Sequence, residues 1–119
     1  MLYALLIYGA REEWARMDRA SRQQRMDCHM KALQMENDDG VLVMSARLQA
    51  TDRATTLRST PEGIVVLDGP FAETKEQLGG LQILNCDSLE EVMKYVRTFV
   101  AHSGTVEIRP IHLDPVSVD

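Results

Sequence analysis

One histidine and one aspartate have the side chains best suited to acid–base chemistry in this sequence. His29 belongs to an expected helix over 22–38, about 40° from Leu33 around the helical wheel, and Asp68 closes an expected strand. An imidazole accepts a proton near neutral pH, and a carboxylate beside it orients the ring and stabilises its cation. We predict that His29 and Asp68 form such a dyad, in which the carboxylate raises the histidine pKa. Alternatively, His29 is a boundary residue of the core and Asp68 only ends its strand.

Four basic residues are candidates for holding an anionic ligand: Arg47, Arg58, Lys75 and Arg109. The three arginines fall on expected strands, and a guanidinium group presents a planar pair of donors to a carboxylate or phosphate. Alternatively, each arginine reaches solvent or pairs with a carboxylate, as Arg109 would with Glu107 on the same strand face. The functional interpretation predicts a site for a small anionic organic molecule, with catalysis left open.

Apolar periodicity and turn residues predict the elements in the first half of the chain. Residues 2–8 are a nearly continuous apolar run, typical of a strand at the centre of a sheet. The helix over 22–38 has a capping-box pattern in Ser21 and Gln24 and ends at Asp39-Gly40. Its inward stripe is expected to contain Met26, Met30 and Leu33. A strand is expected over 41–48.

The second half begins with an expected hairpin, whose strands 54–59 and 64–68 are joined by Thr60-Pro61-Glu62-Gly63. A strand over 81–86 precedes a second helix with a capping box at Ser88 and Glu91. Its apolar residues share one helical face: Leu89, Val92, Met93, Val96 and Val100. The last strand, 105–111, is expected at a sheet edge because Pro110 cannot donate a hydrogen bond.

This order of elements predicts an α+β fold with two helices on one face of an antiparallel sheet. Two helices with one apolar face each cannot cover both sides of the sheet, so the other face needs a partner. A second copy of the chain is the simplest partner, and we therefore expect a homodimer.

Composition predicts a single cytoplasmic domain over 1–119. The formal charge is -5, with +1 on residues 1–60 and -6 on residues 61–119, which argues against nucleic-acid binding. Cys28 and Cys86 show neither a disulfide framework nor a zinc spacing, so reduced thiols and no metal or cofactor are expected. The apolar run at the N-terminus lacks a basic leader and is broken by Gly9 and Arg11, unlike a signal peptide or membrane span.

The segment 68–80 is the least ordinary part of the sequence. Gly69-Pro70 ends a strand sharply and Gly79-Gly80 permits unusual backbone, so residues 69–78 are expected to form an exposed or cleft-rimming loop with at most a short helical turn. The segment resembles the signature of the DGPF branch of the YCII-related family. The resemblance extends over nearly the whole chain, through these further motifs: Tyr8-Gly9, His29-Met30, Gly40-Val41-Leu42-Val43, Ala54-Thr55-Thr56-Leu57-Arg58 and Val106-Glu107-Ile108-Arg109-Pro110-Ile111.

The resemblance implies a ferredoxin-like fold that dimerises into an α+β barrel, in agreement with the predicted element order. It also implies an uncharacterised role, close in fold to small barrel enzymes, with a His/Asp pair in simpler relatives. A second implication is an accessory or regulatory role, without catalysis, linked to an extracytoplasmic-function sigma factor. The chain departs from the family pattern at Ala46-Arg47 and Leu81-Gln82.

Overall fold

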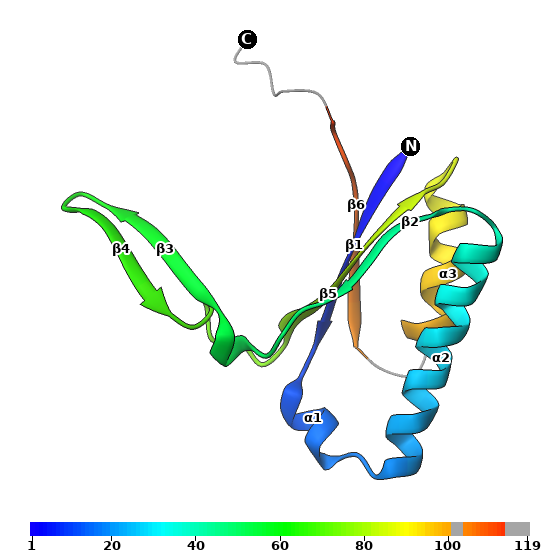
Figure 1. Ribbon diagram of the computed structural model, residues 1–119, viewed down its shortest axis with the longest axis horizontal. Helices are drawn as coiled ribbons and strands as arrows, with labels where there is room; N and C mark the ends of the chain where they lie inside the picture. The colour runs from blue at the N-terminus through cyan, green and yellow to red at the C-terminus, as the bar shows by residue number, and fades with distance from the viewer. Residues whose placement is uncertain (101–103, 114–119) are drawn as a thin grey trace.

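Four antiparallel strands form the sheet on which the rest of the chain is arranged (Figure 1). The computed structural model describes residues 1–100 and 104–113. The strands lie in the order β2-β5-β1-β6, with these bounds: β1 (Leu2–Gly9), β2 (Leu42–Arg47), β5 (Gln77–Asn85) and β6 (Thr105–Pro110). The predicted central position of the first strand and edge position of the last strand are confirmed.

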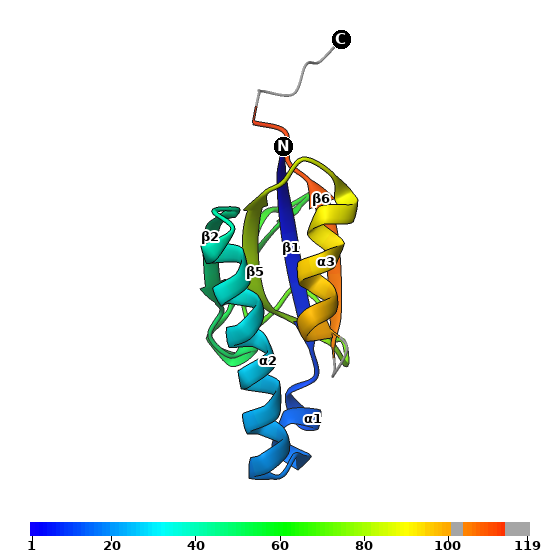
Figure 2. The same ribbon diagram turned by 90° about the vertical axis from the view of Figure 1, so that its right-hand side faces the viewer.

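Two helices cover one face of this sheet, as Figure 2 shows: α2 (Arg19–Asp38) and α3 (Leu89–Val100). The arrangement on one face was predicted and is confirmed. Along α3 the capping residues also behave as predicted, because Glu91 N donates to Ser88 Oγ at 3.2 Å. Asp87 N in turn donates to Glu91 Oε2 at 3.0 Å.

The core lies between the helices and the face of the sheet that carries alternate residues of β1 and β5. Tyr3 pairs with Leu84 and Leu5 with Gln82 in the strand register, and all four side chains are buried. Val92, Tyr95 and Val96 of α3 pack against them. The apolar periodicity of α3 therefore identified its buried face, although Leu89 at the start of the helix is 48% exposed.

Helix α2 departs from its predicted start and from its predicted inward stripe. It begins at Arg19, where the Asp18 carboxylate accepts a hydrogen bond from Ser21 N at 2.7 Å and caps the helix. Met30, predicted to face the core, is 54% exposed. The fully buried residues are Ala32 and Glu36 instead. The inward row runs through small and polar side chains, which the apolar pattern does not register.

A short helix that was not predicted, α1 (Arg11–Arg16), precedes α2. The Trp14 ring holds it against α2, because the guanidinium groups of Arg22 and Arg25 lie 5.6 and 5.7 Å from the ring centroid. Arg25 also pairs with Glu13 at 3.3 Å. These contacts set the position of the first turns of α2.

The predicted hairpin is confirmed: β3 (Thr55–Thr60) pairs with β4 (Gly63–Asp68). It projects away from the four-stranded sheet as an arm (Figure 1), after a 3-10 turn, η1 (Thr51–Arg53). Gly69 has φ of +104° and its N–H donates to Ala54 O at 2.7 Å, which closes the base of the arm. The expected loop at 69–78 is shorter than predicted, because β5 already begins at Gln77.

The sheet order and the two helices on one face give a ferredoxin-like α+β fold, with the β3–β4 arm inserted between β2 and β5. Among the described helices, none combines the length and apolar character needed to cross a membrane.

Candidate functional site

His29 lies on the side of α2 that faces the end of β2. Its ring is half-buried, and its pKa is lowered, first because burial penalises the cation and second because the positive charge of Arg47 acts on it. Arg47 is the last residue of β2 and pairs with Gly80 of β5. Since Gly80 and Gln82 share the helix-facing side of β5, Arg47 projects from the side of the sheet that carries α2. Burial and the exposed Arg47 cation therefore both disfavour the protonated form of His29.

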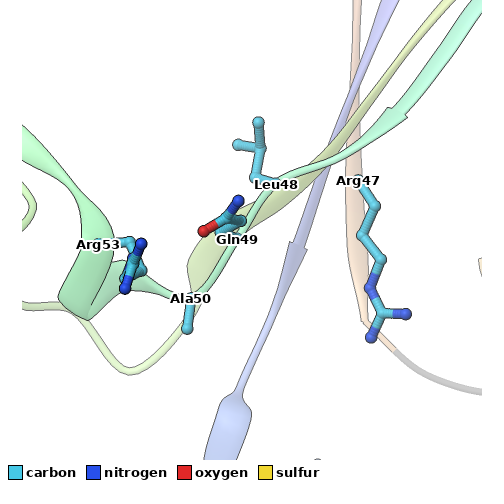
Figure 3. Close-up of a pocket in the computed structure, with 5 residues that line it drawn as sticks. All are labelled: Arg47, Leu48, Gln49, Ala50 and Arg53. Atoms are coloured by element: carbon cyan, nitrogen blue, oxygen red, sulfur yellow. The ribbon is translucent and has the colours of Figure 1, made fainter.

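Arg47 also borders an open hollow of about 620 Å³, lined with Leu48, Gln49, Ala50 and Arg53 (Figure 3). Two backbone bonds shape this stretch: Leu48 N donates to Gly79 O, and Arg53 N donates to Ala50 O, each at 2.9 Å. Arg47 and Arg53 lie at opposite ends of the lining residues, and their guanidinium groups carry charge of one sign. The hollow is suited to an anion.

The structure does not bring Asp68 to His29 within one chain. Asp68 ends β4, is exposed and lies in the arm, on the other side of the molecule from α2 in Figure 1. In a single chain the pKa of His29 is lowered rather than raised. The predicted rise required Asp68 beside the ring, so it stays a prediction. The dyad was predicted from residue types and strand ends, and neither of these contains the direction in which the arm leaves the sheet.

The other three predicted ligand-binding cations lie apart from Arg47. Arg58 is exposed on β3 of the arm, and Lys75 is exposed in the loop before β5. Arg109, on the edge strand β6, makes an ion pair with Glu107 at 2.8 Å, which raises its pKa. The pairing of Arg109 with Glu107 was the alternative considered from the sequence.

Two features of the site region escaped prediction. Arg53 lies in the 3-10 turn between predicted strands, so no periodicity distinguishes it. Glu36 and Gln82 are polar residues buried between α2 and β5, and an acid at helical spacing from His29 was the only available sign. Among the described residues, no three of His, Cys, Asp and Glu gather in a way that would hold a metal ion.

A search of solved structures finds the same fold in an enzyme. The chain is similar to 5-chloro-2-hydroxyhydroquinone dehydrochlorinase from Burkholderia phenoliruptrix AC1100, whose structure was determined in complex with 2,5-dihydroxybenzoquinone. The TM-score is 0.51 over 94% of each chain, with 14% sequence identity. At this identity the likeness establishes the α+β fold alone.

Sequence comparisons identify relatives along the whole length. An uncharacterised protein from Rhizobium meliloti is 36% identical over 120 residues, which cover 95% of this chain and 94% of the relative. The family model of the YCII-related domain matches residues 1–113. The match concerns the domain as a whole, so the DGPF branch remains a prediction from residues 68–80. The chain belongs to the YCII-related family.

Proposed function

We propose that the protein binds a small anionic organic molecule in the hollow beside β2, and that His29, which does not line the hollow but is linked to it through Arg47, acts as a neutral proton acceptor. The observation that carries this proposal is the position of Arg47, which borders the hollow and also acts on His29. Arg53 supplies a second positive charge at the far end of the lining residues.

The chemistry that this arrangement supports is removal of a proton from an acidic substrate. With its pKa lowered, the His29 imidazole is unprotonated at neutral pH and able to act as a base. The Arg47 guanidinium would stabilise the negative charge that develops on the substrate. The ligand in the dehydrochlorinase structure, 2,5-dihydroxybenzoquinone, has acidic hydroxyl groups on a small ring, and this supports a ligand of that class here.

A homodimer is part of this proposal. The sheet face away from the helices carries half-buried or exposed apolar residues: Leu6, Met44, Leu81 and Ile83. The arm adds exposed apolar residues of its own: Leu57, Ile64, Val65, Val66 and Leu67. An isolated two-stranded hairpin is barely stable in water, so we expect both surfaces to be covered by a second copy.

The predicted role of Asp68 requires this second copy. Because the arm points away from α2 of its own chain, the Asp68 carboxylate would reach His29 only across a subunit interface. Replacing Asp68 with Asn should then lower the pKa of His29 in the assembled protein. An unchanged histidine titration would remove Asp68 from the site without affecting the roles of His29 and Arg47.

Ligand binding is tested by thermal shift with a panel of small hydroxyquinones and carboxylates. Wild type should be stabilised by at least one class, and Arg53→Gln should lose most of that shift. Arg19→Gln, at an exposed position on α2, is the matched control and should keep it. Equal shifts in wild type and Arg53→Gln would place the ligand elsewhere and reject the proposal for this hollow.

An accessory role in a sigma-factor system is the second candidate. The exposed apolar arm favours it, because such a surface is suited to docking a protein. This role would be supported if a sigma factor copurified with the wild-type protein and no longer copurified when Val66 is replaced with Lys. A cytoplasmic location is consistent with both candidates, and the free thiols of Cys28 and Cys86 support it.

A further inference from the structure

A buried polar pair joins α2 to the sheet away from the hollow. Glu36 of α2 and Gln82 of β5 are 0% and 1% exposed. Gln82 Nε2 donates to Ser45 Oγ of β2 at 3.2 Å. Both carboxyl oxygens of Glu36 and the Oε1 atom of Gln82 lack a hydrogen-bond donor among the described residues. Three buried acceptor atoms thus lack a donor, although the Gln82 side chain is close enough to the Glu36 carboxyl to act on its pKa.

The addition of one proton resolves this arrangement. An ionised carboxylate only accepts hydrogen bonds, whereas a neutral carboxylic acid also donates one. A buried acceptor without a donor is costly, and a buried charge without a partner costs more. We propose that Glu36 is a neutral acid whose hydroxyl donates to Gln82 Oε1, and that release of this proton to solvent loosens α2 from the sheet.

Among the residues that the structure describes, no positive charge acts on the pKa of Glu36 to favour the ionised form. Burial raises its pKa to about 7, and Gln82 is the one described side chain that acts against this rise. At the end of β5, Cys86 is buried, and Glu36 contributes to the raised pKa of its thiol. On α3, Tyr95 donates to Asp39, and Glu91 lies close enough to raise the pKa of Tyr95. Arg47 on β2 acts on His29 instead.

The proton matters for the proposed site because the same helix carries both groups. Glu36 and His29 are seven residues apart on α2, about 10 Å along the helix axis, and both face inward. Ionisation of Glu36 would place a bare charge under the last turns of α2. The structure therefore contains a pH-sensitive attachment of the helix that positions His29, and this inference stands whether or not the hollow binds a ligand.

The direct test is a carbon NMR titration of the Glu36 carboxyl in the wild-type protein. We expect a midpoint close to 7 rather than the ordinary value of 4.5. Amide hydrogen exchange in the second half of α2 should then accelerate above that midpoint, and by more than the intrinsic exchange rate increases over the same pH range. A midpoint at the ordinary value would mean that Gln82 has its amide reversed and donates to a carboxylate, and would overturn the proposal.

Glu36→Gln supplies the independent test, since it fixes the neutral form and keeps the shape. Between pH 5 and 7 the unfolding equilibrium constant of wild type should rise, relative to this variant, by up to about tenfold per pH unit. Glu12→Gln, at an exposed position on α1, should follow wild type. Identical pH profiles for wild type and Glu36→Gln would also overturn the proposal. If Glu36→Gln does not fold, the NMR titration of wild type decides alone.

Discussion

The hydroxyl of Tyr95 donates a 2.6 Å hydrogen bond to the Asp39 carboxylate and thereby ties the middle of α3 to the end of α2. Tyr95 is 1% exposed, and its pKa is raised by burial and by Asp39, so the phenol remains a neutral donor. The bond joins the two helices that cover the sheet, and it involves a charged acceptor, which makes it stronger than a bond between neutral groups.

Tyr95→Phe should destabilise the protein by about 1.5 to 3 kcal/mol, the usual range for a hydrogen bond to a charged group. The ring remains in place, so the change isolates the hydroxyl. Urea unfolding at neutral pH is the measurement. Tyr8→Phe, which removes the same oxygen from a half-buried position on β1, is the control and should change stability by less than about 0.5 kcal/mol. Equal effects would show that the bond to Asp39 contributes nothing.

Gly104→Ala should be more damaging than Gly40→Ala, although both glycines have positive φ. A side chain at φ of +71° costs about 1 to 2 kcal/mol, and Gly40 otherwise has open space around it. At Gly104, with φ of +83°, an added Cβ would also lie 3.0 Å from Tyr8 O of the central strand. The thermal unfolding midpoint of Gly104→Ala should therefore be lower than that of Gly40→Ala, and the reverse order would contradict this geometry.

Most of the fold was predictable because the relevant signals are local. The arm has Pro61 and Gly63 in its turn, the last strand has Pro110, and α3 has a regular apolar face. These features act within a few residues of one another, and the structure confirms each of them. The length of β5 was not predictable, because the strand was expected to start at residue 81, after the double glycine. The structure begins it at Gln77 and passes it through a register shift, with Leu78 opposite Tyr8 and Gly80 opposite Ile7.

The inward face of α2 could be predicted only in part from apolar spacing. Its buried row contains Ala32 and Glu36 and continues to His29, which are small or polar side chains. Met30 is apolar and exposed, whereas Met26 and Leu33 of the predicted stripe are half-buried, so the apolar pattern identifies the inward face only in part. What buries this row is the packing of α2 against β2 and α3, a long-range contact that sequence spacing does not record.

The candidate site was predictable only in part, because residue types can be read from the sequence but the path of the arm cannot. His29 and Arg47 were both identified from residue type, and the structure brings them together. The pairing of His29 with Asp68 required the path of the arm, which depends on η1 and on the hydrogen bonds at the base of the hairpin. Arg53 lies in η1, and its place beside the hollow could be recognised only from the structure.

Replacing Arg47 with Met should raise the pKa of His29, because the positive charge of Arg47 is the second cause of its lowered value. The pKa should remain below 6.5, since burial is the larger cause. An imidazole NMR titration measures the shift, with Arg58→Met on the arm as the distant control. An unchanged His29 pKa in Arg47→Met would show that the charge of Arg47 does not act on His29.

The lowered pKa of His29 also fixes the sign of a pH effect on stability. The folded state binds this proton less tightly than the unfolded chain does, so below pH 6.5 the unfolded state holds more protons. Stability should therefore decrease as the pH falls from 6.5 through the folded pKa. His29→Gln should remove that part of the acid sensitivity in urea unfolding at pH 5 to 7. An unchanged slope would contradict the shift.

Ile83→Glu should convert the proposed homodimer to a monomer. Ile83 lies on β5 between Gln82 and Leu84, which face the core, so its half-buried side chain points to the uncovered face. A carboxylate there would be solvated in a monomer but buried without a partner in a dimer, which strongly opposes association.

Mass measurement in solution should give a dimer for wild type and a monomer for the variant. Met30→Glu makes a similar change at an exposed position on α2, and it should remain dimeric. A monomeric wild type, or a dimer that tolerates Ile83→Glu, would show that this face is not the interface. If the wild type is a dimer that tolerates Ile83→Glu, the exposed apolar strands of the arm would be the remaining apolar surface through which two copies associate.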